Sequence, residues 1–140
     1  MKRKISVEAF IYNEKKDEVL IIRKKDFTWK LPGGDVPMDK TMEDTLKLKI
    51  KQQTNMDIVI NTLLFCKENR TAWEHVCRFV FQATAVGDFY DLSNDNSVYQ
   101  VKWLPILTAN NLIDLEDITL NKLIFIKGVL YKCNNELHVR

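Results

Sequence analysis

Hydrophobic and polar residues alternate near the start of the chain as they do in β-strands. The alternation over residues 4–12 places apolar side chains on both sides, which predicts a strand whose two faces are each at least partly covered. The polar run 13–18 then predicts a turn, and residues 19–23, rich in β-branched side chains, predict a second strand. The chain is therefore expected to open with a β-hairpin.

A helical period follows in the middle of the chain. An apolar residue recurs at every fourth position and predicts a helix over residues 41–54, with a stripe formed by Met42, Leu46 and Ile50. Thr41 followed by Asp44 resembles a capping box with a shorter acid, which gives this helix a defined start.

The second half of the chain returns to strand patterns. Strands are predicted over residues 58–65, 75–85 and 98–104, a loop over 87–97, and a closing helix over 117–132 despite Gly128. Strands in the majority, together with two helices, predict a single α+β domain over residues 1–140, in which the helices pack against a mixed sheet.

Composition fits this folded domain and narrows the functions. Hydrophobic residues make up 46% of the chain, while only four Gly and three Pro argue against a disordered or fibrous protein. A net charge of +2 predicts neither nucleic-acid nor membrane binding, and no apolar run approaches the ~20 residues that cross a bilayer. Three cysteines without a Cys-x-x-Cys pair predict free thiols in a reducing cytoplasm.

A glycine pair that leads into the predicted helix carries the first chemical signal. Residues 29–34 end in Leu-Pro-Gly-Gly, and with the capped helix behind them they resemble the loop and helix of the Nudix box. The opening hairpin, the strand around Val80 and Phe81, and residues 101–105 also resemble their counterparts in this family, so that the resemblance covers nearly the whole chain. It implies a Nudix-like α/β/α sandwich with a mixed β-sheet.

The acidic residues of that box are replaced in this chain. The family pattern is Gly, five residues, Glu, seven residues, Arg-Glu, an aliphatic, any residue, Glu-Glu, any residue, Gly, an aliphatic. With its first Gly on Gly34, the charged positions of the pattern fall on Lys40, Leu48, Lys49, Gln52 and Gln53. Asn55, where the family has Gly, is compatible with a left-handed helix cap. The skeleton of the box is present, but the site is far more positive than a complete box.

These exchanges bear on the reaction that the resemblance implies. Enzymes of the family split a phosphoanhydride in a nucleoside diphosphate linked to another group, with Mg²⁺ or Mn²⁺ held by carboxylates. Positions 49, 52 and 53 share one face of a helix, and a Lys ammonium ~4 Å from a divalent ion would repel it by about 8 kcal/mol at an effective dielectric of ~20. Gln offers a neutral oxygen and Lys offers no acceptor. We therefore expect no catalytic residues in the box, no metal cofactor and no ordinary hydrolysis.

The same residues can form an anion site, which is our first functional hypothesis. A nucleotide-like or other anionic ligand, bound without metal, would contact Arg23, Gly33, Gly34, Lys40 and Lys49. The competing interpretation is a solvated basic helix face, to which Lys47 and Lys51 also belong. Three aromatic side chains near the loop could stack on a base: Phe10, Phe27 and Trp29. Single aromatic residues near a sheet are more often core residues, and Trp29 in particular is expected to be structural.

Two other hypotheses remain open. A diverged Nudix pyrophosphohydrolase would hold Mg²⁺ or Mn²⁺ through other acids such as Asp35, Glu43 or Asp95, whereas Asp39 and Asp44 are better placed to cap the helix. Alternatively, the scaffold serves as a structural or interaction protein, with homodimerisation as one possibility.

The remaining histidines and cysteines carry no motif. We expect His75 to be an edge or partly buried strand residue and Cys77 to be a small core residue, and we reject a Cys–His enzyme built from them because side chains at i and i+2 on one strand are expected to lie too far apart. His138 is assigned no function.

Overall fold

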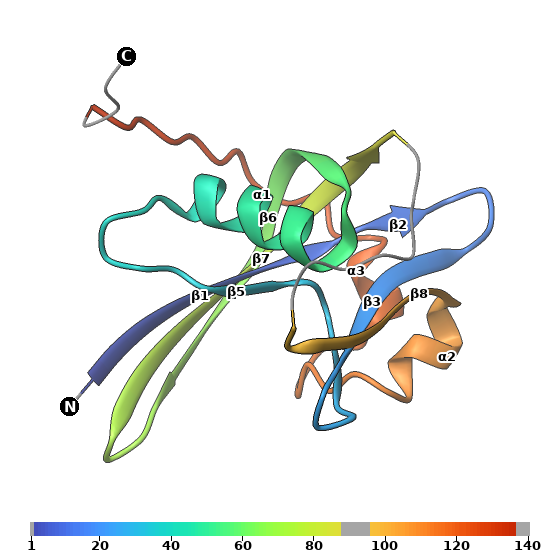
Figure 1. Cartoon of the computed structure of the whole chain (residues 1–140), viewed down its shortest axis with the longest axis horizontal. Helices are drawn as coiled ribbons and strands as arrows, with labels where there is room; N and C mark the ends of the chain where they lie inside the picture. Colours follow the sequence, from blue (N-terminus) through green and yellow to red (C-terminus); the bar gives the residue numbers. More distant parts are fainter. Residues whose placement is uncertain (1, 88–95, 137–140) are drawn as a thin grey trace.

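The computed structural model describes residues 2–87 and 96–136 (Figure 1). In chain order its elements are β1 (Lys2–Phe10), β2 (Tyr12–Asn13), β3 (Glu18–Lys24), β4 (Trp29–Lys30), β5 (Gly33–Asp35), α1 (Met42–Thr54), β6 (Asp57–Arg70), β7 (Glu74–Val86), β8 (Val98–Pro105), α2 (Ile106–Asn110) and α3 (Leu120–Leu123). Within these ranges, none of the helices combines the length and the apolar character needed to cross a membrane. Part of the predicted loop over 87–97, with Asp95, and also His138 lie outside the described residues.

The strands form two four-stranded sheets within the described chain. The first has the order β5-β1-β7-β6 and is mixed, because β1 runs parallel to β7 and antiparallel to β5. The second is built around β3, which pairs antiparallel with β2, β4 and β8. The chain passes directly from β1 into β2 and so connects the two sheets.

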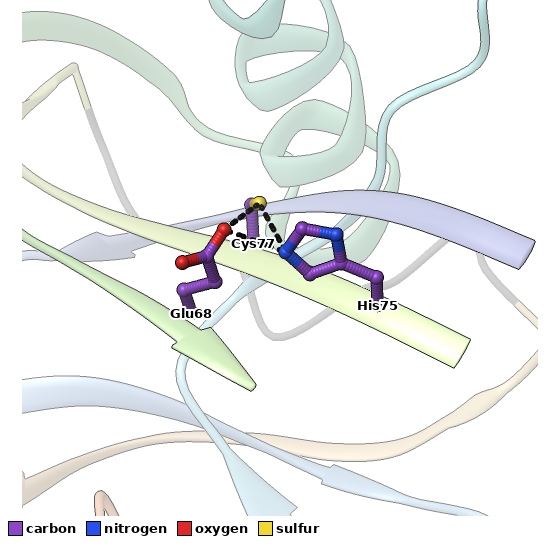
Figure 2. Close-up of side chains that lie close together, drawn as sticks. All are labelled: Glu68, His75 and Cys77. Atoms are coloured by element: carbon purple, nitrogen blue, oxygen red, sulfur yellow. Dashed lines mark hydrogen bonds and ion pairs between the residues drawn. The ribbon is translucent and has the colours of Figure 1, made fainter. Parts of the chain in front are cut away.

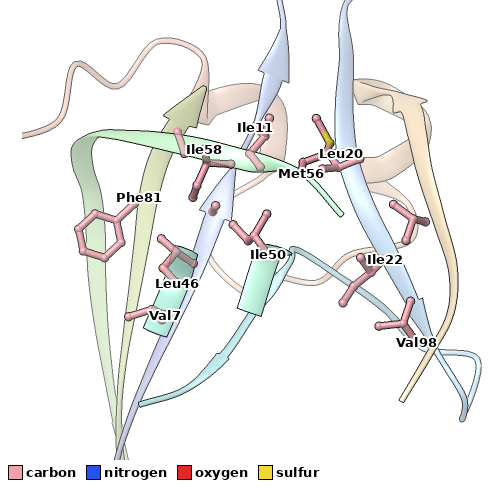
Figure 3. Close-up of a cluster of buried hydrophobic side chains, with 13 residues drawn as sticks. Val7, Ile11, Leu20, Ile22, Leu46, Ile50, Met56, Ile58, Phe81 and Val98 are labelled. Carbon is pink, nitrogen blue, oxygen red and sulfur yellow. The ribbon is translucent and has the colours of Figure 1, made fainter. Parts of the chain in front are cut away.

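Two apolar clusters lie on opposite sides of β1 and β3. The first contains Val7 and Leu20 and is covered by α1, whose Leu46 and Ile50 are fully buried (Figure 3). The second contains Phe10 and receives its helical side chains from α2 and α3. The strands are thus covered on both faces, which confirms the interpretation of residues 4–12 and the predicted α/β/α sandwich with a mixed sheet.

Helix α1 begins and ends as the sequence predicts. The Thr41 hydroxyl accepts a hydrogen bond from the Asp44 N–H at 3.1 Å. At the other end Asn55 adopts a left-handed conformation with φ 63°, and its N–H donates to the Lys51 carbonyl at 2.9 Å. Both ends of α1 are therefore fixed by local hydrogen bonds, which sets the helix register beside the Gly-Gly loop.

The predicted closing helix over residues 117–132 is wrong. Only Leu120–Leu123 is helical, and the following chain runs along the edge strand β6, where Val129 and Leu63 exchange both backbone hydrogen bonds at 2.9 and 3.0 Å. Gly128 has φ 78°, and a Cβ there would lie 2.7 Å from the Thr62 hydroxyl and 2.8 Å from the Leu63 carbonyl oxygen. Pairing with a strand distant in sequence outweighs the local helical period.

Candidate functional site

The glycine pair fits a place where two backbones touch. Gly33 lies opposite Glu8 in the β1–β5 ladder and has φ 149°. A Cβ at this position would lie 2.0 Å from the Val7 carbonyl oxygen, a backbone atom that cannot move aside alone. Gly33 is therefore required by the packing of β5 on β1.

Gln53 ties α1 to this glycine. Its side chain is 5% exposed, its Nε2 donates to the Gly33 carbonyl at 2.9 Å, and its Oε1 accepts from the Gly33 N–H at 3.0 Å. Both amide atoms are matched to the peptide group. A carboxylate at this position would instead place an oxygen about 2.9 Å from the Gly33 oxygen, where two acceptors need a cation or a proton between them. The amide of Gln53 removes that need.

Lys49 lies over the second glycine. Its Cε, Cδ and Cγ come within 3.2, 3.3 and 3.5 Å of the place that a Cβ on Gly34 would take. The aliphatic stem thus packs on the Gly34 backbone, as long cationic side chains do when they cover a surface while their head remains in water. The structure brings together the two residues, one in the loop and one in the helix, that the box alignment placed in one site.

A cavity of about 810 Å³ follows one side of α1. Its lining includes four of the five exchanged box positions, namely Lys40, Leu48, Lys49 and Gln52. Gln53 is not among them, because it points to Gly33. Helical spacing predicted that positions 49, 52 and 53 all face the site, but only Lys49 and Gln52 line the cavity.

Charges in the cavity are separated along α1. Asp39, Lys40 and Asp44 line the end near the helix N-terminus, where the acidic residues outnumber the lysine, whereas Lys49 and Gln52 lie further along the helix. Asp44 and Gln52 are eight positions apart, or about 12 Å at 1.5 Å per residue. Negative charge beside the N-terminus is the arrangement that the helix dipole favours. The Lys49 end is left as the basic part of the cavity.

Arg23, which the sequence analysis grouped with the anion site, is placed elsewhere. It does not line the cavity. Its guanidinium carbon lies 4.9, 5.2 and 5.9 Å from the ring centroids of Phe27, Trp29 and Tyr99, and its Nε donates to the Phe27 carbonyl at 3.3 Å. Trp29 also packs against the second apolar cluster, and Phe10 is 2% exposed within that cluster. These aromatic side chains therefore contact Arg23 or pack in the core, and they do not line the cavity.

The alternative carboxylates do not gather beside α1 in the part of the chain that the structure describes. Asp35 pairs with Lys4 at 3.7 Å, and Glu43 pairs with Lys47 at 3.2 Å. Among the described residues, the one group of three metal-capable side chains with converging donor atoms is Glu68, His75 and Cys77, on the β6–β7 hairpin (Figure 2). The donors present along α1 do not fit a carboxylate-held Mg²⁺ or Mn²⁺ ion.

That hairpin corrects one expectation. His75 and Cys77 were judged too far apart to touch, but the Cys77 sulfur lies 3.9 Å from His75 Nε2. Cys77 is partly buried rather than a core residue, and all three cysteines of the chain are free.

A buried charged residue that no sequence motif indicates, Glu8, lies on the face of β1 that is turned away from α1. Glu8 is 5% exposed and forms an ion pair with Arg78 of β7. Lys30 of β4 lies close enough for the Glu8 carboxylate to raise its pKa, but burial outweighs this and lowers the pKa of Lys30. The available signal was a charged residue in the middle of a strand that is apolar on both faces.

Known proteins resemble this chain in sequence. The NUDIX domain family model matches residues 2–123. The chain is 29% identical over 101 residues to the human 8-oxo-dGDP phosphatase NUDT18, covering 68% of this chain and 30% of that protein. It is 28% identical over 108 residues to the ADP-ribose pyrophosphatase of Methanocaldococcus jannaschii, covering 64% and 63%. The chain thus spans less than two thirds of the length of these curated relatives.

Solved structures agree on the architecture. A NUDIX hydrolase from Nitrosomonas europaea superposes with a TM-score of 0.72 at 15% identity, covering 89% of this chain and 87% of that one. The MutT protein from Methanosarcina mazei Go1 gives 0.68 at 20% identity, covering 89% and 93%. At these identities the likeness shows the fold alone. Because the NUDIX domain model covers most of its length, this chain belongs to the Nudix family.

Proposed function

We propose that this chain binds a nucleotide-like or other phosphate-bearing ligand in the cavity beside α1 and does not hydrolyse it by the metal-dependent chemistry of the family. The observation that carries the proposal is the double hydrogen bond between Gln53 and Gly33. The Gln53 amide occupies the place where a carboxylate would need a cation. Lys49 over Gly34 adds a positive charge to the same loop.

Size and charge support a ligand of this class. Small-molecule sites enclose ~300–1,000 Å³, and the cavity holds about 810 Å³. Lys49 provides an ammonium group at the basic end of the cavity, and Lys40 provides a second one beside Asp39 and Asp44. Ammonium groups bind phosphate as point charges without a metal to offset the ligand charge. The names of the relatives, an 8-oxo-dGDP phosphatase and an ADP-ribose pyrophosphatase, both refer to nucleoside diphosphate compounds. We carry over this ligand class and not the reaction. A cytoplasmic location stays a prediction.

Binding is tested by titrating the purified chain with ADP-ribose and with 8-oxo-dGDP, without divalent cations, by calorimetry. We expect saturable binding that Lys49→Gln weakens about tenfold or more, since a hydrogen bond to a charged group contributes ~1.5–3 kcal/mol. Lys47→Gln is the matched control, because Lys47 lies on the same helix, pairs with Glu43 and does not line the cavity. No binding of either compound, or an equal loss in both variants, would contradict the proposal and favour a solvated helix face or an interaction protein.

Hydrolysis is tested with the same two compounds in Mg²⁺ and in Mn²⁺. We expect no metal-stimulated release of phosphate or nucleoside monophosphate above the rate without protein. The names of the relatives favour the alternative, a diverged hydrolase. Stimulated release that disappears when Asp35, Glu43 and Asp95 are replaced by their amides would establish that alternative.

A further inference from the structure

A second set of side chains converges on the β6–β7 hairpin, in the half next to its turn (Figure 2). Glu68 of β6 is the cross-strand partner of Cys77 of β7, and His75 precedes Cys77 by two residues. Directly opposed side chains, and those at i and i+2, share a face of a sheet. The hairpin register therefore brings a carboxylate, an imidazole and a thiol together on the face that also carries Phe79 and Phe81.

The donor atoms form a compact triangle. His75 Nε2 lies 2.6 Å from Glu68 Oε2 and 3.9 Å from Cys77 Sγ, and Cys77 Sγ lies 4.0 Å from Glu68 Oε2. In the plane of this triangle, a point about 2.1 Å from both the nitrogen and the oxygen also lies about 2.1 Å from the sulfur. If the point moves about 0.6 Å out of the plane and keeps its distances to nitrogen and oxygen, its distance to the sulfur becomes about 2.3 Å. Zn²⁺ bonds of ~2.0–2.2 Å to nitrogen and oxygen and ~2.3 Å to sulfur match these three distances. The nitrogen–oxygen edge of 2.6 Å subtends only about 77° at such a point, so it must open to about 3.4 Å for a tetrahedral site, and the exposed Glu68 side chain permits this movement.

We propose that Glu68, His75 and Cys77 bind a divalent transition-metal ion of the Zn²⁺ type on the β6–β7 hairpin. One sulfur, one nitrogen and one oxygen donor form a mixed set that suits a borderline-soft ion and suits Mg²⁺ poorly. The two ligand charges, from the carboxylate and the metal-bound thiolate, balance a 2+ ion. Three protein ligands leave the fourth tetrahedral position to water.

Arg3 sets the resting state of this site. Its Nε donates to His75 Nδ1 at 3.3 Å, so that Nδ1 is an acceptor and Nε2 carries the proton that it donates to Glu68. An ion at Nε2 replaces this proton, and His75 then needs an acceptor at Nδ1, where Arg3 offers only donors. Arg3 must therefore swing away for the metal to bind. Its exposed position at the start of β1 permits this movement.

Cys66 is the nearest further thiol. It pairs across the strands with Phe79, one position along the same face, and is therefore diagonal to Cys77. Burial, reinforced by the charges of Cys77 and Glu68, raises the pKa of the Cys66 thiol. Its sulfur is not one of the three donor atoms that converge, and we do not count Cys66 among the ligands.

The test is a Co²⁺ titration of the full chain, reduced and stripped of metal, followed by displacement with Zn²⁺. Thiolate-bound tetrahedral Co²⁺ gives a near-ultraviolet charge-transfer band and visible bands that need no enzymatic activity. We expect one ion per chain and displacement by Zn²⁺. Cys77→Ser should lose the charge-transfer band and weaken binding by at least about 100-fold, since even residues that only orient ligands contribute about 10–100-fold. Cys133→Ser is the matched control and should bind as the natural chain does.

Two further variants keep the proposal testable if Cys77→Ser folds poorly. Glu68→Gln, at an exposed position, should weaken binding about tenfold or more. Arg3→Gln should tighten it about two- to fivefold, because it removes an exposed opposing charge and offers an acceptor to Nδ1. Absence of uptake below about 1 mM Co²⁺, loss of the band in Cys133→Ser, or weaker binding in Arg3→Gln would each overturn the proposal. None of these results bears on the ligand site beside α1, which uses other residues.

Discussion

The Nudix-box region and the β6–β7 hairpin share the first sheet, which contains β5, β6 and β7 and is covered by α1, but the side chains of the two regions differ in their ability to bind a cation. At α1 the family framework is intact, yet an amide is bound to Gly33 and an ammonium stem covers Gly34. On the hairpin, at positions outside the box, the donor atoms of a carboxylate, an imidazole and a thiol lie within 4.0 Å of one another. The fold determines where the backbone positions lie, whereas the side chains at those positions determine whether a cation can bind. The presence of the framework is therefore weak evidence for metal at α1.

The largest effect that this comparison predicts is on the loop itself. Gly33→Ala should lower the free energy of unfolding by about 3 kcal/mol or more, because the new Cβ meets the Val7 backbone oxygen at 2.0 Å. Gly87→Ala is the matched control, since Gly87 also has positive φ, 87°, but nothing lies within 4 Å of its added Cβ. That change should cost only about 1 kcal/mol. Urea unfolding of both variants provides the measurement, and equal losses would mean that β5 does not hold its place on β1.

The next effect separates the two neighbouring glutamines. Gln53→Leu leaves the N–H and the carbonyl of Gly33 without their partner in a buried place, and should cost about 2–4 kcal/mol in urea unfolding. Gln52→Leu, at an exposed position that lines the cavity, should cost clearly less, about 1 kcal/mol or below, because water can replace the polar contacts of an exposed side chain. If the two variants were equally stable, the amide of Gln53 would not connect α1 to β5, and the physical reason for expecting no metal there would fail.

A third prediction converts one region toward the other. The variant Lys49→Glu, Gln52→Glu, Gln53→Glu restores three acidic positions on α1 and should gain specific Mn²⁺ binding, measured by electron paramagnetic resonance of the free ion. The experiment is done in a Cys77→Ser background, so that the hairpin does not contribute. The single change Cys77→Ser is the control and should bind no Mn²⁺ specifically. Tight uptake by that control would show that α1 already holds a cation in the natural chain.

Features of the fold that depend on residues close together in the chain were predictable from the sequence, whereas those that depend on distant residues were not. Helix α1 was predicted with both caps because Thr41 and Asn55 act within one turn. The closing helix failed because the pairing of Val129 with Leu63 connects residues far apart in the chain, which local periodicity cannot detect. Coverage of β1 on both faces followed from its own alternation, whereas the placement of Glu8 beside Arg78 required the parallel pairing with β7.

The candidate site divides in the same way. Alignment with the box correctly brought Lys49 to Gly34, because the loop and helix are adjacent in sequence. It misjudged Gln53, because the position of Gln53 on the helix circumference does not reveal whether it faces the cavity or β5. The cluster of Glu68, His75 and Cys77 was missed because it depends on the register across the hairpin turn. Pairing the predicted strands 58–65 and 75–85 about their intervening turn was the signal that could have found it.

The smallest effect concerns the C-terminal segment, which contributes Asn135 to the cavity beside α1. The Tyr131 ring packs edge-on against Phe81 at 4.9 Å, and burial, followed by a hydrogen bond with Cys133, raises the pKa of Tyr131 to about 12. An unfolded tyrosine titrates near pH ~10, so the folded chain holds this proton more tightly. The contribution of Tyr131 to stability is therefore complete below pH ~10 and is lost as the pH rises toward about 12. Between these values the urea midpoint of the natural chain should fall more than that of Tyr131→Phe, by a small margin because the side chain is partly exposed. Parallel profiles would mean that Tyr131 is not held against the first sheet, and that the C-terminal side of the cavity beside α1 is open. The cluster of Glu68, His75 and Cys77 would be unaffected, because its geometry depends on none of these residues.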